Sequence, residues 1–241
     1  ESVGAGRIMA VGSSGWGGAG SAVGAGARNQ SGIGSVVLTN GLFDNAYITV
    51  GSLDGFWTSS RFAVVNAADP PIRFGTINLV QGTSSPIFRS RLLATTIQNV
   101  SFGNTFIDAT SFQAIGNIGT ISAQEIRNST IGGQAQEFRN GQVLAGGTVN
   151  SITATGDISD LMVDVIGSIS GGITGRNLTR LSVDVDGSLR SVSASGDVRS
   201  SQFTAGSINS FSAVDIRSTS ITAGGVVSSV SARGAITDAA F

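Results

Sequence analysis

Three aspartates, Asp164, Asp184 and Asp186, have the spacing that most suggests a chemical site in this chain. Asp184 follows Asp164 after about 20 residues, a period typical of stacked-repeat folds, and Asp186 lies two positions further along the same face of an extended segment. If the chain repeats with that period, the three carboxylates lie roughly 5 to 7 Å from each other. Oxygen ligands at such distances suit calcium, or the acid and base pair of a glycosidase.

A simpler interpretation places the same three aspartates on an ordinary solvated face. Arg176, Arg180 and Arg190 are close in sequence and carry the charge that neutralises them. The sequence favours this interpretation over a cation site, and favours a cation site over catalysis. We therefore expect no catalytic residues and no cofactor, with calcium at the three aspartates as the alternative.

A second set of polar residues recurs at similar intervals, just before apolar residues. Its members are Glu125, Asp157, Asn177, Asp197 and Asp215, followed two positions later in three cases by Arg127, Arg199 and Arg217. Aspartate and asparagine before a buried strand suit a corner of the chain. Alternating exposed charges of opposite sign contribute at most a few tenths of a kcal/mol each, so this set predicts structural corners.

Composition excludes several classes of chemistry. The chain of 241 residues has no histidine and no cysteine, and all its basic residues are arginine. Imidazole bases, thiolate nucleophiles, Schiff-base lysines and zinc or haem sites are therefore excluded. A net charge of -1 provides no positive potential to attract the phosphate backbone of nucleic acid. No apolar stretch of the sequence is long enough for a membrane span.

A repeat of about 19 to 20 residues positions these side chains. Its clearest markers are glycines that recur at nearly equal spacing, Gly147, Gly167, Gly187, Gly206 and Gly225. Apolar residues recur at fixed offsets from each glycine, with alternation of period two between them. Three short strands with glycine or Gly-Asp corners fit this length. The pattern predicts an all-β chain, a parallel β-solenoid, and its crossovers favour a right-handed β-helix.

The apolar columns of the predicted solenoid can be stated residue by residue. Second after each glycine stand Val149, Ile169, Leu189, Ile208 and Val227. About five after it stand Ile152, Ile173, Val192, Phe211 and Val230, with Ile173 displaced by one position. Ten or eleven after it stand Ile158, Leu178, Val198, Ile216 and Ile236. Fifteen or sixteen after it stand Val163, Val183, Phe203, Ile221 and Phe241.

The repeat also extends upstream. Residues 116–131 align without a gap with residues 206–221, and the interval from Gly116 to Gly147 exceeds the others by more than half a repeat. We therefore predict a solenoid over 75–241 with an inserted loop near 132–146. Residues 1–34 form a Gly/Ala/Ser-rich extension, and 35–74 a small β lead-in or cap that ends at Pro70 and Pro71.

Several short segments of the repeat resemble the repeats of a known class of protein. "GSINSFSA", "SGDVRSS" and "TAGSINS" resemble the glycine-rich parallel β-solenoid repeats of bacterial cell-surface proteins, including large adhesins and secreted repeat proteins of planctomycete type. The resemblance implies an extracellular or cell-surface structural role. The calcium-binding Gly-Gly-x-Gly-x-Asp nonapeptide is missing from the chain, which argues against a calcium roll.

With most catalytic chemistry excluded, we expect a structural filament subunit that binds copies of itself head to tail and is not an enzyme. Phe241 lies on a core column with no polar cap after it, so we expect it at an interface. The glycine-rich extension would add to a neighbour's sheet edge through main-chain hydrogen bonds, anchored by Ile8, Val11, Trp16 and Val23. The alternatives are an adhesin fragment that binds cell-surface glycans, and a carboxylate-based polysaccharide hydrolase or lyase.

Overall fold

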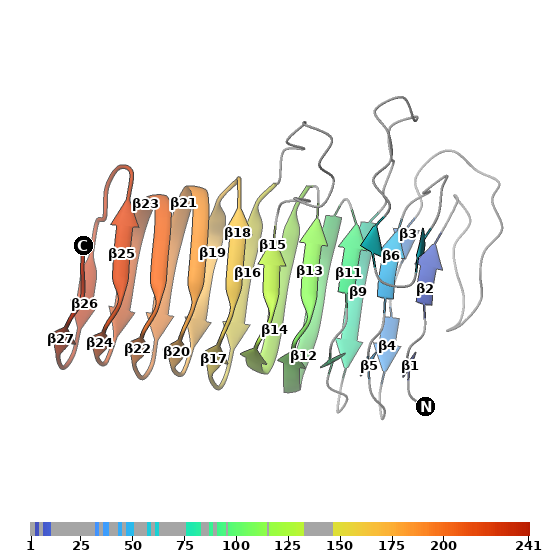
Figure 1. Ribbon diagram of the computed structural model, residues 1–241, viewed down its shortest axis with the longest axis horizontal. Coiled ribbons are helices and arrows are strands. Elements are labelled where there is room, and N and C mark those ends of the chain that lie inside the picture. The colour runs from blue at the N-terminus through green and yellow to red at the C-terminus, as the bar shows by residue number, and fades with distance from the viewer. Residues whose placement is uncertain are drawn as a thin grey trace.

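The structure of the protein is a computed structural model. Its main feature is parallel backbone pairing between residues about one repeat apart. It describes residues 76–82, 87–88, 91–94, 96–114, 116–132 and 147–241, together with the backbone of eight short strands between Val3 and Phe62. The described residues form strands and no helix. Figure 1 shows the strands stacked side by side from one end of the molecule to the other, and the predicted parallel β-solenoid is confirmed.

Each coil of the solenoid has three sides. The first side is formed by β9 (Thr76–Gly82), β12 (Thr96–Asp108), β14 (Ile118–Arg127), β16 (Val149–Ala154), β19 (Ile169–Gly175), β21 (Ser182–Ala194), β23 (Gln202–Ala213) and β26 (Val230–Ala232). The second side is formed by β10 (Ile87–Phe88), β17 (Ile158–Ser159), β20 (Leu178–Thr179), β22 (Val198–Arg199), β24 (Ile216–Arg217) and β27 (Ile236–Thr237). The third side is formed by β11 (Arg91–Ala94), β13 (Ser111–Ala114), β15 (Thr130–Gly132), β18 (Met162–Val165) and β25 (Ser220–Ala223).

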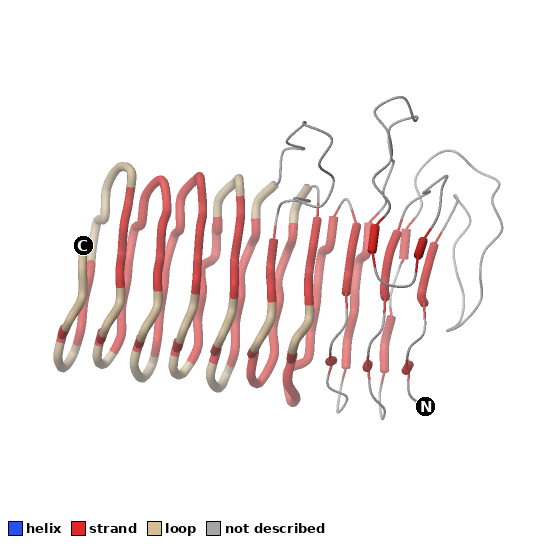
Figure 2. Tube along the Cα trace, in the orientation of Figure 1, coloured by secondary structure: helices blue, strands red, loops and turns tan. Residues whose placement is uncertain are grey.

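Four of these strands turn a corner, as the long red segments of Figure 2 show. β12 and β14 continue from the first side into the second, because their last residues pair with β10 and β17. β21 and β23 begin on the third side, where they pair with β18 and β25, and end on the first side of the next coil. The ladder therefore passes round the coil with few interruptions.

The predicted apolar columns form the core. Ile158, Val198 and Ile216 follow one another in register on the second side and are fully buried. On the third side Phe203 packs edge to face against Phe211 of the first side, with ring centroids 5.0 Å apart. Both rings are fully buried, so they add to the apolar contact between the two sides.

One irregularity in the repeat has a local cause. Ile173 pairs with Ile152 although the spacing slips by one position, because β19 forms a bulge opposite β16. Gly172 in this bulge has a φ of 110°, and a Cβ there would come within 2.1 Å of the Ser191 hydroxyl oxygen. Only glycine fits that conformation and that approach, which explains the Gly-Gly pair inside a strand.

The ladder also continues beyond the region where the sequence predicts the solenoid. β3 (Gly32–Ile33) and β4 (Val36–Leu38) pair with β9, while β5 (Phe43–Asp44) and β6 (Tyr47–Val50) pair with β10 and β11. β1 (Val3–Gly4) and β2 (Arg7–Ala10) pair in turn with β5 and β6. β7 (Trp57–Thr58) and β8 (Arg61–Phe62) form a separate antiparallel pair. Strands of the predicted extension and lead-in thus belong to the same parallel sheet as the solenoid.

The predicted inserted loop lies between two strands that are paired with their neighbouring coils. β14 pairs with β16, so that Ile118 lies opposite Val149 although the chain between them is longer than one ordinary repeat. The next coil resumes the ordinary register, because Val149 lies opposite Ile169. The additional residues of this coil therefore leave the ladder intact, and 133–146 lie outside the described residues.

We predict that Phe203→Ala lowers the free energy of unfolding by about 3 to 5 kcal/mol, because it removes a fully buried ring and leaves a cavity against Phe211. Urea denaturation followed by far-UV circular dichroism measures the change. Replacing the neighbouring exposed Gln202 by alanine is the control and should change stability by less than about 0.5 kcal/mol. Equal effects of the two substitutions would contradict the assigned core.

Candidate functional site

The structure brings the predicted aspartates together without forming a metal site. Asp164 of β18 lies directly opposite Asp184 of β21, and Asp184 in turn lies opposite Thr204. Burial raises the pKa of the half-buried Asp164, and the charges of Asp184 and Asp186 raise it further. Within the described residues, no three side chains of metal-binding type gather closely enough to hold an ion. The three aspartates therefore form a repulsive group on an open strand face.

Two of the arginines expected to neutralise this group bind elsewhere, so that part of the interpretation is wrong. Arg176 donates to Asp157, with Nε 2.9 Å from Oδ1. Arg180 donates to Asp160, with Nε 2.5 Å from Oδ1 and Nη2 2.7 Å from Oδ2. The cause is the ladder, which places each arginine one coil above its own aspartate at a corner.

We predict that Asp164→Asn stabilises the protein at neutral pH. Because the folded-state pKa of Asp164 is raised, its carboxyl contributes stability that is fully present below its unfolded pKa and is lost as pH rises through the folded value. The asparagine side chain does not ionise, so the variant does not lose this stability as pH rises. The gain at pH 7 should reach at most about 1 kcal/mol because solvent screens the neighbouring charges.

The control for this prediction is Asp160→Asn, since hydrogen bonding to Arg180 lowers the pKa of Asp160. That carboxylate contributes stability above its unfolded pKa, and the contribution is lost as pH falls through the folded value. The two variants should therefore shift the thermal midpoint at pH 7 in opposite directions, and the gain from Asp164→Asn should vanish below about pH 4. A loss of stability in both variants at pH 7 would contradict the repulsive group.

Four members of the second polar set, all except Glu125, have the structural role that the sequence predicts. Oδ1 of Asp157 accepts from the backbone N–H of Asn177 at 3.2 Å, and Oδ1 of Asn177 accepts from the N–H of Asp197 at 3.0 Å. Asp197 and Asp215 accept in the same way from the coils that follow them, at 3.2 and 2.6 Å. Each side chain therefore caps a backbone donor of the next coil at the corner between the first and second sides.

The flanking arginines complete these corners. Arg199 pairs with Asp197, and Arg217 with Asp215 at 2.5 Å. Nη1 of Arg127 lies 3.7 Å from Oε2 of Glu125. The Cζ atom of the same guanidinium lies over the ring of Phe106, 4.4 Å from the ring centroid. The backbone N–H of Ala235 and then Arg217 lower the pKa of Asp215. These contacts hold the corners of the coils in which they occur.

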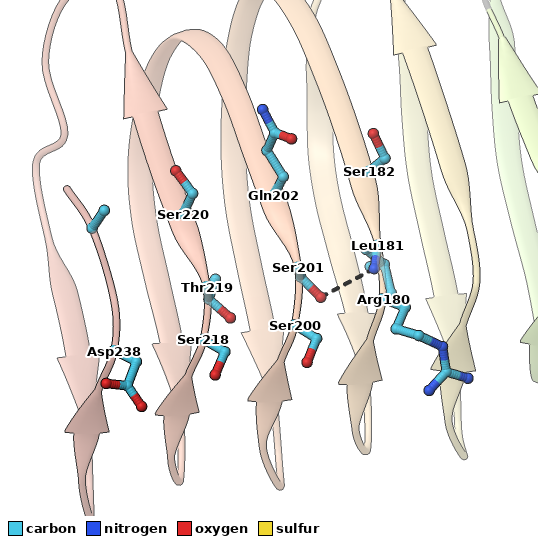
Figure 3. A pocket seen from close by; sticks show the side chains of 11 residues that line it. Arg180, Leu181, Ser182, Ser200, Ser201, Gln202, Ser218, Thr219, Ser220 and Asp238 are labelled. Atoms are coloured by element: carbon cyan, nitrogen blue, oxygen red, sulfur yellow. Dashed lines mark hydrogen bonds between the residues drawn. The ribbon is translucent and has the colours of Figure 1, made fainter.

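A groove that the sequence analysis missed runs along the corner between the second and third sides. Its volume is about 700 Å³. Figure 3 shows two rows of side chains along it, one with Ser200, Ser218 and Asp238 and the other with Ser182, Gln202 and Ser220. Arg180 lies toward one end and Asp238 toward the other. The groove is lined by hydroxyl and amide groups together with apolar surface.

The backbone at this corner explains the position of the first row. Asp160, Arg180, Ser200, Ser218 and Asp238 all have φ between 49° and 55°, the left-handed conformation that residues other than glycine rarely adopt. Below them, the buried hydroxyl of Ser201 donates to the Arg199 carbonyl at 2.8 Å and accepts from the Leu181 N–H at 3.1 Å. The turn is thereby fixed by internal hydrogen bonds, and the side chain before it is turned outward.

The hydroxyls of the two groove rows differ from several hydroxyls on the first side, which bond the neighbouring coil. On the first side, Ser188 bonds Ser168 at 3.2 Å and Ser212 bonds Ser193 at 3.4 Å, so neighbouring coils satisfy one another. In the described part of the chain, the side chains of the groove row Ser182, Gln202 and Ser220 make no hydrogen bond, and neither do those of Ser200 and Ser218. The groove therefore keeps its hydrogen-bonding capacity for solvent or a ligand.

The outer face of the coil that contains β26 and β27 exposes the core columns. Ile236 and Phe241 have exposed fractions of 46 and 65%. Ile236 lies opposite Ile216, and the Ile221 N–H donates to the Ala240 carbonyl, so Ile236 and Phe241 occupy columns that are buried in the preceding coils. These two residues do not point into a closed core as the column pattern predicts, because a coil covers them on one side only.

The other predicted interface residues belong to the N-terminal extension. Ile8 is part of β2 and lies opposite Ile48 of the same chain. Val11, Trp16 and Val23 lie outside the described residues. The expected strand addition of this segment to a neighbouring molecule stays a prediction.

The fold and these surfaces define a β-solenoid repeat protein. Comparison with protein-family models, with curated proteins and with solved structures finds no match to the chain. None of the described segments forms a helix with the length and apolar character that crossing a bilayer requires. Function must therefore be argued from the surfaces of the chain itself.

Proposed function

We propose that this chain is a structural subunit of a cell-surface or extracellular filament, in which a second copy covers the exposed coil of β26 and β27. The observation that carries the proposal is the continuous parallel ladder, whose coils stack in one register so that a further coil can continue the same columns. An uncovered ladder edge with apolar side chains is an association site unless something covers it. The extracellular setting rests on the resemblance of the repeat phrases to those of bacterial surface proteins.

Energetics support association through this face. Fully burying one large apolar side chain contributes about 1.5 to 3 kcal/mol, and the face exposes Ile236 and Phe241 together. Half-buried Val227, Val230 and Ala232 pack against the core in the same coil and would be covered at the same time. Strand pairing adds backbone hydrogen bonds, so the face can offset part of the entropy that two copies lose when they associate.

We predict that replacing both Ile236 and Phe241 by serine abolishes self-association, because the apolar face is lost while the buried columns below it remain. Light scattering coupled to gel filtration measures the mass, and electron microscopy shows whether filaments form. Met162→Ser is the matched control, since Met162 is also 55% exposed but lies on the third side, away from this face. A monomeric parent protein at all accessible concentrations would overturn the proposal.

Glycan binding is a second candidate function, favoured by the unused hydroxyl and amide groups of the groove. The groups recur once per coil, about 4.8 Å apart, on a rigid ladder in which Ser182, Gln202 and Ser220 are direct neighbours. A neutral oligosaccharide laid along the solenoid axis would meet donors and acceptors in each coil. The three aspartates on the open strand face do not line this groove, so no observation favours hydrolysis there.

We predict that the protein binds at least one of three neutral hexasaccharides, made of β-linked glucose, mannose or N-acetylglucosamine. The double substitution of Gln202 and Ser220 by alanine should weaken that binding at least tenfold. Each substitution removes a hydrogen-bonding group that makes no side-chain bond within the described structure. Isothermal titration calorimetry measures the affinity, with Ser228→Ala as an exposed serine outside the groove for control. The absence of binding to all three sugars would refute this second function without affecting the first.

A further inference from the structure

The open face of the first side consists of small polar residues in register. One column runs through Ser101, Ser122, Thr153, Thr174, Ser193, Ser212 and Ser231, each opposite the next. Two positions earlier in the same strands lies a second column, formed by Asn99, Thr120, Ser151, Gly172, Ser191 and Ser210. We call these two columns the first-side face. Figure 2 shows the coils following one another in a straight row, so the columns run straight along the solenoid axis.

The first-side face carries no charge of its own. Neither column contains an ionisable residue, and the position directly before the second column is charged once, at Arg190. The long Arg190 side chain lies at the margin of the face, where its guanidinium can reach water. Ion pairs such as that of Arg176 with Asp157 lie beyond the face, at the corner. Two copies of the face can therefore meet without bringing rows of like charges together.

Several hydroxyl donors of the face are already used inside the molecule. The Ser122 hydroxyl donates to the Val100 carbonyl at 3.3 Å. Ser151 and Ser212 donate to hydroxyls of the preceding coil, at 3.3 and 3.4 Å. A polar group that keeps its hydrogen bond costs little to remove from water. Covering the first-side face leaves these donors bonded, whereas the two groove rows need a ligand with polar groups of its own.

We propose that two copies pack side by side through this face, first side against first side, with their solenoid axes aligned. Both faces repeat once per coil, about every 4.8 Å, so small side chains of one copy can lie between those of the other along the whole length. Flat sheets with ladders of such side chains are stabilised by stacking. A sugar or another hydrogen-bonding polymer fits this face less well, because donors that it would need are bonded within the solenoid. This lateral contact is separate from the end-to-end contact of the proposed filament.

The size of the face indicates a contact that is weak in a single pair and stronger along a filament. The face extends over the strands from β12 to β26, about 30 Å along the axis and about 20 Å across. Two copies together then bury on the order of 1,200 Å², the lower end of the range for specific interfaces. Subunits aligned in two neighbouring filaments make many such contacts at once, so the filaments pair more tightly than single molecules do.

Charges introduced on the face test the lateral contact. Thr153 and Ser193 lie in the same column with one coil between them. Thr153→Asp with Ser193→Asp should abolish side-by-side packing, because two negative faces repel each other. The control is Thr179→Asp with Ser200→Asp, which adds the same charge outside the face. Electron microscopy measures the width of the assemblies and light scattering their mass. We expect assemblies two solenoids wide from the unmodified and control proteins, and at least tenfold fewer of them from the face variant.

Recovery by opposite charge separates repulsion from misfolding. A protein with Thr153→Arg and Ser193→Arg, mixed with the aspartate variant, should restore paired solenoids, and circular dichroism of each variant shows that it is folded. Absence of this recovery between folded variants contradicts the contact. Filaments one solenoid wide in the unmodified protein overturn this inference and leave the proposed filament standing. Paired solenoids that form no filament support the inference and refute the filament, and monomers alone refute both.

Discussion

Parallel backbone pairing between successive coils is the constraint on which every other feature of this molecule depends. Once a residue is paired with the residue one coil away, its side chain stacks on the same column, about 4.8 Å further along the axis. A buried column is therefore apolar throughout, as from Ile158 to Ile216. A polar column can be satisfied by its own neighbours, as at Asp157 and Asn177, or can repel along its length, as at Asp164 and Asp184.

Pairing across coils also explains which parts of the structure follow from sequence alone. Apolar periodicity was sufficient for the fold class, the three sides and the buried columns, because a residue with few polar options can only pack inward. The displaced Ile173 was visible in the sequence, but its cause required the backbone, where Gly172 takes up the additional residue in a bulge.

Polar partners were less predictable, because several arginines lie at comparable distances along the sequence from each carboxylate. The ladder decides between them, and it assigns Arg176 to Asp157 and Arg180 to Asp160. The groove was missed for a related reason, since its residues are ordinary exposed serines. A usable signal was present: Ser201 and Thr219 are polar at a position where Leu161 and Leu181 are apolar, and such buried hydroxyls indicate a tight turn.

The direction of the backbone hydrogen bonds has a mechanical consequence. Bonds between coils lie along the solenoid axis, so a pull on the two ends of the molecule along that axis loads the coils in series and detaches them one after another. Each detached coil releases about 65 Å of extended chain while the rest of the stack stays folded. Under axial tension the molecule would lengthen in steps, and it would absorb work at each step instead of failing at once.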